Sequence, residues 1–488
     1  MILTRRAHSL AAVFKALIAI LFFTLCFVVS YDRLRGTSSL QVMSNHLPSN
    51  LNLTAAHFPP ELIRFWIDFA DLLVQARPVC SEIKIDHAPP NDTETRFEPD
   101  NPNKQRVDFL RLSAEDQQAV KNSHSFMVKQ ALHKAPNLFY NRRTRGIVTT
   151  AGPRYVPILL VSLRMLRRSG SKLPVEVFLG SWDEYNSTIC EGIFPSLGAR
   201  CRVLTDIYNK APSIAKPEHF QFKIFAILFS SFEDVLFLDA DAFPGNNPDD
   251  LFLTEPYSSY GLVTWPDIFG NTASRLYFQI ASISEPPVSL RLSSESGQLL
   301  LSKSKHAADL LLMTYYNYYG PSYYYPLLCQ GSHGAGDKET FIHAAMALNR
   351  QFWDVRERPW VLGHWKKGQF GLVAIAQHHP GDDWRIESGQ IRSNDPTTPR
   401  PLFVHNHFHK LDPKTIIEEG GPTRDAEGNY QRMWGPKESI LDRFGHDLEQ
   451  EVWKEILITG CDARTDTCAK IKDYYNAMYR YGNYGEII

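Results

Sequence analysis

The sequence has no cluster of basic residues and almost no net charge. Its 488 residues include 52 Lys+Arg and 53 Asp+Glu, for a net charge of −1, which argues against a nucleic-acid partner. No internal repeat is visible. The cysteines lack the spacing of a zinc knuckle, and no H-E-x-x-H segment occurs, which argues against a helix-borne metal hydrolase. The length suits one large α/β domain with an appended anchor and stem.

Only one long apolar run stands out, and it lies near the N-terminus. Residues 11–30 are almost wholly apolar, and a membrane span needs about 20 such residues. Arg5 and Arg6 precede the run, which favours a cytoplasmic N-terminus. A cleaved signal peptide is the alternative, but the run is long for one and no clear cleavage site closes it. We therefore predict a cytoplasmic tail at 1–10 and a transmembrane signal-anchor at 11–30, with the rest in the secretory lumen.

Sequons and cysteines beyond the apolar run fit a lumenal location. N-x-S/T sequons begin at Asn52, Asn91 and Asn186. Six of the seven cysteines follow the run, and an even number in an oxidising compartment favours disulfides. Many pairings are open. Cys190–Cys201 and Cys461–Cys468 would close short local loops, and buried free thiols are the alternative.

The rest of the chain divides into a stem and a folded domain. Residues 31–135 are expected to form a lumenal stem, with a helix at 58–77 after a Pro-Pro start and a loop at 86–105. The folded domain is expected at 136–488. There, strands are predicted at 146–150, 175–179, 201–204 and 234–239, with helices at 157–168 and 217–231. This alternation predicts an α/β fold with a mostly parallel sheet flanked by helices, which binds ligands at the carboxyl ends of its strands.

Asp239 and Asp241 are the strongest chemical signal. They follow the apolar strand VLFL, so both carboxylates can turn toward one point at the ligand edge of the sheet. Carboxylates are hard oxygen ligands suited to Mn²⁺ or Mg²⁺, and such an ion can neutralise a departing diphosphate. D-x-D alone is a weak motif, and a turn pair capping a helix is the alternative. The position after a buried strand favours the metal site.

The region around this motif resembles the fungal Golgi mannan-branching α-mannosyltransferases. Residues 230–244 look like the D-x-D strand of that family, and further similar segments follow its order at 146–152, 173–178, 295–298, 336–340 and 403–405. The resemblance covers residues 145–412, while the stem and the C-terminal segment carry much less of it. It implies a GT-A-like, Rossmann-type mixed sheet, a type II Golgi membrane protein, Mn²⁺ (or Mg²⁺) as cofactor and GDP-mannose as donor.

Candidate nucleotide-binding residues surround the first predicted strand and the helix before the D-x-D. A small-residue turn after the first strand would let backbone N–H groups approach phosphate, although an ordinary strand–helix turn is equally compatible. Lys223 lies in the apolar segment FQFKIFAILF, where a buried charge needs a partner. Related enzymes carry a basic residue at similar spacing that contacts the sugar-phosphate, whereas a surface lysine is the alternative. The full set is Thr149, Thr150, Ala151, Gly152, Arg154, Lys223 and Asp239.

Three further residues are candidate catalytic groups because of the resemblance. Glu295 and Gln298 belong to the segment that lies beside donor and acceptor in the family, and the amide of Gln298 could bind sugar hydroxyls. The alternative for this segment is a β-turn before a core strand. Asp337 would face the donor sugar or the acceptor hydroxyl, and helix N-cap is its alternative role.

Histidines and tyrosines complete the candidates. His405, His407 and His409 alternate, so on a strand they would share one face and could bind zinc by themselves. The resemblance favours His405 as the third ligand of the D-x-D metal, with a hydrogen-bonded packing role as the alternative. The tyrosine-rich segment 315–325 could stack on sugars or belong to the core.

The resemblance implies a retaining α-mannosyltransferase that moves mannose from GDP-mannose to a mannose-containing glycan in the Golgi, and only the resemblance favours mannose over another sugar. One alternative is a retaining galactosyl- or glucosyltransferase that uses a UDP-sugar. Another is a non-catalytic glycan-binding scaffold subunit of a Golgi complex, although the intact D-A-D argues against it. Expected partners are the nucleotide-sugar, the glycan acceptor, the membrane through the anchor and a Golgi enzyme complex.

Overall fold

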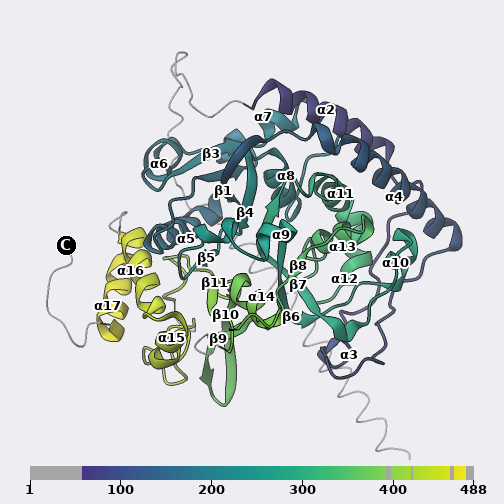
Figure 1. Ribbon diagram of the computed structural model, residues 1–488. Coiled ribbons are helices and arrows are strands. Elements are labelled where there is room, and N and C mark those ends of the chain that lie inside the picture. Colours follow the sequence, from purple (N-terminus) through teal and green to yellow (C-terminus); the bar gives the residue numbers. More distant parts are fainter. Residues whose placement is uncertain (1–57, 392–396, 419–420, 462–465, 480–488) are drawn as a thin grey trace, which may run out of the picture. The chain divides into compact units, whose positions relative to one another are not determined.

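The protein is built around two β-sheets (Figure 1). Its structure, a computed structural model, describes residues 58–391, 397–418, 421–461 and 466–479. All of these residues belong to one compact unit, Ala55–Ile488. The predicted tail, the anchor and the first part of the stem, residues 1–57, lie outside the described residues. Among the residues that are described, no helix combines the length and apolar character required to cross a membrane.

The larger sheet has seven strands in the order β3-β2-β1-β4-β7-β6-β8, and the smaller has four in the order β5-β11-β10-β9. In the larger sheet only β7 runs against the other strands. This confirms the predicted α/β fold with a mostly parallel mixed sheet flanked by helices, and the four predicted strands correspond to β1–β4. The bounds are β1 Asn141–Thr150, β2 Val175–Leu179, β3 Ala199–Val203, β4 Phe232–Leu238, β5 Ala242–Pro244, β6 Leu262–Gly270, β7 Leu292–Ser302, β8 Trp353–Asp354, β9 Trp360–Lys366, β10 Gln369–His378 and β11 Pro401–His405.

The centre of the larger sheet is buried on both faces, as the apolar strand sequences require. Along β4, Val235 and Phe237 join the core on one face, while Leu236 and Leu238 join the core on the other. Side chains alternate between faces along a strand, so an uninterrupted apolar run such as VLFL fits only a strand covered on both sides. This places the carboxyl end of β4 inside the protein rather than at its surface.

Helices cover both faces of this sheet (Figure 1). One layer contains α2 (Pro60–Gln75), α4 (Ala114–Lys134), α8 (Gln221–Phe229), α10 (Arg275–Ala281), α11 (Ala307–Tyr318), α12 (Tyr325–Cys329) and α13 (Thr340–Ala347). On the other side, α5 (Val156–Arg168) packs between the larger sheet and the smaller one, with α15 (Lys437–Phe444), α16 (Leu448–Cys461) and α17 (Asp466–Tyr479) beyond it. The remaining short helices are α3 (Asp92–Thr95), α6 (Phe194–Ser196), α7 (Thr205–Tyr208), α9 (Tyr257–Tyr260) and α14 (Pro380–Glu387).

Two helix predictions can be compared directly with these bounds. The helix predicted at 157–168 is α5. The helix predicted at 217–231 is shorter, because α8 begins at Gln221. His219 has a φ of 46°, a left-handed conformation that a right-handed helix excludes, so the helix starts only after this residue.

Part of the predicted stem is packed against the sheet. The helix predicted at 58–77 is α2, and its buried Trp66 and Phe69 belong to the same core as β4. The compact unit therefore begins well before residue 136. The tyrosine-rich segment also contributes here: the hydroxyls of Tyr315 and Tyr319 donate to the carbonyls of Ala76 and Leu73 at the end of α2. These two tyrosines thus tie α2 to the core.

Both local disulfides suggested by the cysteine spacing are present, Cys190–Cys201 and Cys461–Cys468. The first joins β3 to the segment that precedes it, and the second joins α16 to α17. Cys80 and Cys329 are free thiols. The sequon asparagines Asn91 and Asn186 are exposed, whereas Asn52 lies outside the described residues.

Candidate active site

A cavity of about 810 Å³ lies at the edge of the larger sheet where β1 and β4 end. This volume is within the range of about 300–1,000 Å³ that is usual for small-molecule sites. Its walls come from several elements far apart in the sequence. They include Thr150, Ala151 and Gly152 after β1, Lys223 on α8, Asp239 and Asp241 after β4, Asp267 and Phe269 on β6, Glu295 and Ser296 on β7, His333, Asp337 and Lys338 before α13, and His405, His407 and Lys410.

Asp239, Asp241 and His405 converge at this cavity. One ligand atom from each lies within 4.8 Å of the others. The two aspartates are placed by the end of β4, where the backbone N–H of Asp239 donates to the carbonyl of Gly297 on β7 at 2.8 Å. The chain then turns into β5, which pairs with β11 so that Ala242 lies opposite His405. The pairing of these two short strands therefore brings His405 to the D-x-D segment.

Glu295 orients His405. The Nδ1 of His405 lies 2.9 Å from Oε1 of Glu295, and its Nε2 lies 3.2 Å from Oδ1 of Asp241. A carboxylate on one ring nitrogen fixes the ring and leaves the other nitrogen for a metal. Gly297 makes this approach sterically feasible, because a Cβ at that position would lie 2.4 Å from Nδ1 of His405. Gln298 supports the carboxylate in turn by donating its amide to Oε2 of Glu295 at 2.6 Å.

The charges in this group are strongly coupled. Burial raises the pKa of Asp239 to about 6, although Lys223 and His405 oppose that shift. Burial would also raise the pKa of Asp241, but His405 and Lys410 outweigh it and hold that pKa well below its usual value. The pKa of His405, which burial would lower, is raised well above its ordinary value by Glu295 and Asp241. His405 and Lys410 thus pair with the carboxylates of this group.

Lys223 bridges two carboxylates of the cavity wall. Its Nζ lies 3.3 Å from Oδ2 of Asp239 and 3.2 Å from Oδ2 of Asp337. It also donates to the carbonyl and hydroxyl oxygens of Ser296, at 2.6 and 2.9 Å. The partner that a lysine in this apolar helix requires is thus the acidic wall of the cavity, and the alternative of a surface lysine is wrong because Lys223 is only 6% exposed.

The structure corrects two purely structural roles that the sequence allowed, a β-turn at 295–298 and a helix N-cap at Asp337. Residues 295–298 do not form a turn, because they lie within β7. Asp337 is not the N-cap of α13: Glu339 occupies that position, and the Asp337 side chain accepts instead from Ser296 and pairs with Lys223. The helix begins after the loop turns, so Asp337 is left free to face the cavity.

Several candidates lie away from the cavity wall. Thr149 is buried and Arg154 is exposed, and neither contributes to the lining, unlike Thr150, Ala151 and Gly152. Gln298 is fully buried behind Glu295, so it holds that carboxylate rather than facing the cavity.

The three histidines do not form a zinc face. The strand β11 ends at His405, so His407 and His409 lie beyond it and the alternation predicted for a strand does not apply. His407 lines the cavity and stacks obliquely on His405, with ring centroids 4.7 Å apart. The metal-ligand geometry thus includes only the first of the three.

Lys410 is a site residue that the sequence analysis missed. Its Nζ donates to Oδ2 of Asp241, and the side chain lines the cavity. The only available signal was a lysine five residues after His405 in a polar segment, which is too common to be informative. Its position depends on how the chain leaves β11.

Comparison with known proteins bears on this same region. Residues 144–291 and 287–395 match a family described as mannosyltransferase. The α-1,2-mannosyltransferase MNN21 of Candida albicans is 36% identical over 71% of this chain and 62% of its own length. MNN23 of the same organism is 30% identical over 71% of both chains, and MNN2 of Saccharomyces cerevisiae is 35% identical over 55% of this chain and 51% of its own. The chain thus spans less than two thirds of MNN21.

Among solved structures, the apo form of the glycosyltransferase GlyE from Streptococcus pneumoniae TIGR4 aligns over 68% of this chain and 64% of its own. The sequence identity is 13% and the TM-score is 0.32. The family match covers Asp239, Asp241, Glu295 and Asp337, whereas His405 and Lys410 lie beyond its last residue.

Proposed function

The chain belongs to this mannosyltransferase family, and we propose that it is a retaining α-mannosyltransferase that transfers mannose from GDP-mannose to a mannose-containing glycan. The observation that carries the proposal is the convergence of Asp239, Asp241 and His405 on one cavity. The relatives compared above are α-1,2-mannosyltransferases by name, which favours an α-1,2 linkage in the product. The resemblance to Golgi enzymes and the apolar run at 11–30 support a type II Golgi membrane protein.

The three converging residues fit a divalent cation. Two carboxylates suit Mn²⁺ and Mg²⁺, and an imidazole favours the transition metal of the two. The contact between Glu295 and His405 is the outer support that metal-bound histidines usually have. Asp239, Asp241 and His405 would hold Mn²⁺, which when bound supplies the positive charge that neutralises a leaving diphosphate.

Other residues of the cavity would bind and orient the donor. Lys223 holds Asp239 and Asp337 in place through its ion pairs with both. Asp337 also lines the cavity, where its carboxylate can accept hydroxyl groups of the donor sugar. The small residues Ala151 and Gly152 allow the nucleotide to approach the end of β1 closely.

Retention of the anomeric configuration follows if an α-linked donor gives an α-linked product. The departing phosphate can then accept the proton of the attacking hydroxyl, so no strong general base is required. Glu295 is unsuited to that role, because it already accepts from Gly297, Gln298 and His405. Burial opposes its ionisation, yet His405 lowers the pKa of Glu295 to about 2, which makes it a weak base.

A donor screen tests the proposal. The purified protein is incubated with Mn²⁺, a mannoside acceptor and each of GDP-mannose, UDP-galactose and UDP-glucose, and the product linkage is analysed. We expect transfer from GDP-mannose with formation of an α-linkage. Transfer from a UDP-sugar instead would replace the proposed donor. If none of the sugars is transferred while Mn²⁺ and GDP still raise the melting temperature, a non-catalytic glycan-binding role is favoured.

A further inference from the structure

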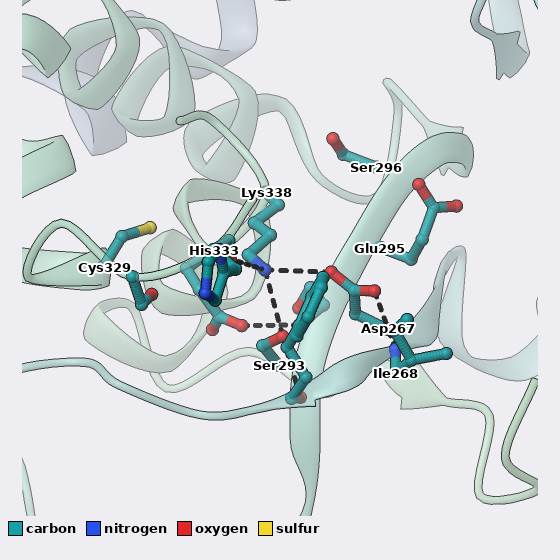
Figure 2. Close-up of polar contacts among 12 residues, drawn as sticks. Asp267, Ile268, Ser293, Glu295, Ser296, Cys329, His333 and Lys338 are labelled. Carbon is teal, nitrogen blue, oxygen red and sulfur yellow. Dashed lines mark hydrogen bonds and ion pairs between the residues drawn. The ribbon is translucent and has the colours of Figure 1, made fainter. Parts of the chain in front are cut away.

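A second buried charged group lines the cavity at the end of β6. The Nζ of Lys338 lies 2.9 Å from Oδ2 of Asp267, 3.1 Å from Oγ of Ser293 and 3.2 Å from the carbonyl oxygen of His333. Figure 2 shows Lys338 extended toward Asp267 and Ser293, with His333 beside it. Both charged residues line the cavity although Asp267 is only 6% exposed and Lys338 only 5%. The metal site described above uses neither of them.

Lys338 has used all of its hydrogen-bond donors, whereas Asp267 still has free acceptor positions. An ammonium group has three N–H donors, and the three contacts of Lys338 occupy all of them. Asp267 accepts from Lys338 on Oδ2 and from the backbone N–H of Ile268 on Oδ1, at 2.7 Å. A carboxylate offers about four acceptor positions, so about two remain at Asp267. The pair therefore presents acceptors, and no further donor, to a ligand in the cavity.

The position along the sheet separates this group from the metal site. Asp239 follows β4, Glu295 and Ser296 belong to β7, and Asp267 belongs to β6, in the order β4-β7-β6. Adjacent strands are about 4.8 Å apart, so Asp267 lies on the second strand from the metal carboxylates, roughly 10 Å along the sheet. A donor sugar attached to a diphosphate at the metal would lie over β7. The next sugar along the cavity would lie over β6.

Aromatic rings adjoin the pair. Phe269 and His333 both line the cavity, and their rings stack with centroids 5.7 Å apart and an interplanar angle of 30°. Apolar ring faces next to hydroxyl acceptors suit a pyranose, which has a C–H face and a rim of hydroxyl groups.

We propose that Asp267 and Phe269 form the subsite for the acceptor sugar, with Asp267 accepting two neighbouring hydroxyls of a hexopyranose and Lys338 holding Asp267 in position. This inference rests on the proposed function, in which the donor occupies the metal side of the cavity. Lys338 is a positioning residue, because its own donors are already occupied. The class of ligand is a neutral hexopyranoside with a free vicinal diol.

Binding measurements test the subsite independently of turnover. Saturation-transfer NMR titrations with methyl α-mannopyranoside compare the wild type with Asp267→Asn, and the exposed Asp442→Asn serves as the control. Loss of hydrogen bonds to a charged group should weaken binding at least about tenfold in Asp267→Asn. Binding as tight as in the wild type overturns the inference. Deoxy analogues lacking one hydroxyl of the diol should bind the wild type about tenfold more weakly, but should bind Asp267→Asn no worse than the parent mannoside does.

Further variants distinguish binding from folding. Phe269→Ala removes a partly exposed ring and leaves the ion pair intact, and it should weaken mannoside binding about fivefold. Lys338→Met should reproduce the loss seen with Asp267→Asn and add nothing to it in the double variant, whereas Lys338→Arg should restore part of the affinity. If Asp267→Asn is too unstable to measure, unchanged binding by Phe269→Ala overturns the inference.

The two proposals fail separately. Tight mannoside binding by Asp267→Asn, together with mannose transfer by the wild type, rejects the subsite and keeps the function. Binding that depends on Asp267 without any mannose transfer by the wild type keeps a hexopyranoside site and rejects the proposed donor reaction.

Discussion

Glu176 and Asp239 are carboxylates of the same sheet that differ in how many of their hydrogen-bond acceptor positions the protein itself fills. Glu176 on β2 is fully buried and accepts from the backbone and hydroxyl of Ser231 at 3.0 and 2.8 Å and from Arg200 at 2.5 Å. Asp239, at the other group, keeps 28% of its side chain exposed toward the cavity. Burial opposes ionisation at Glu176, but Arg202 and Arg200 lower its pKa. A carboxylate surrounded by protein donors stabilises the fold, whereas one that faces open space can bind a ligand.

Loss of a metal ligand should give the largest effect. In Asp241→Asn one oxygen ligand and its charge are lost, and we expect mannose transfer to fall at least about a thousandfold, because a bound cation supplies several kcal/mol of transition-state stabilisation. The free energy of unfolding should also fall, because His405 and Lys410 lose the carboxylate that they pair with, so the rate is expressed per folded molecule. Initial rates and a urea unfolding curve check both statements, with Asp442→Asn as the control. Wild-type activity in Asp241→Asn would refute the site.

The reverse result is expected at Glu176. Replacing it with Gln leaves Arg202 buried without its charge partner, and removal of one member of a buried pair costs about 3 kcal/mol or more in the free energy of unfolding. The activity of the remaining folded protein should equal that of the wild type. Chemical denaturation and the rate per folded molecule measure the two quantities. An active-site defect without loss of stability would show that the two groups are not distinct.

Lys303 interacts with the charge of Glu176, and its contribution to the free energy of unfolding should depend on pH. Lys303 donates to the carbonyls of Leu228 and Ser230, and burial lowers its pKa to about 7. In the unfolded chain its pKa is about 10.4, so between these values unfolding takes up a proton and a rise in pH favours the folded state. From pH 7 to pH 9 the wild type should gain about 2 kcal/mol relative to Lys303→Met. Unfolding curves of both proteins at both pH values test this, and parallel behaviour would contradict it.

The smallest effect is expected at Glu295, which supports a ligand without being one. Glu295→Gln should weaken Mn²⁺ binding about tenfold, because outer partners of metal-bound histidines typically contribute that much. The affinity is measured from the rise in melting temperature with Mn²⁺ concentration. A loss as large as that in Asp241→Asn would instead mean that Glu295 is itself a ligand.

The parts of the fold and site that depend on neighbouring residues could be predicted from the sequence. The apolar runs of β1, β2 and β4, the amphipathic α5 and the two short disulfide loops depend on residues within about one element of each other, so their patterns are visible in the sequence. Asp239 and Asp241 also follow directly from their place after a buried strand. Gln298 and Thr149 lie on strands, where one register step decides whether a side chain faces the cavity or the protein interior. Arg154 lies instead in the short helical turn Pro153–Tyr155, where its side chain is exposed.

The sequence by itself determined an α/β protein with a D-x-D segment at the ligand edge of its sheet, because strand periodicity and the position of a charge after an apolar run are local properties. Only the tertiary structure decided which side chains complete the site. His405 meets Asp241 across 164 residues of sequence, through the pairing of β5 with β11. Lys410, and the joining of Lys338 to Asp267, likewise depend on contacts between distant segments, and no local pattern specifies those.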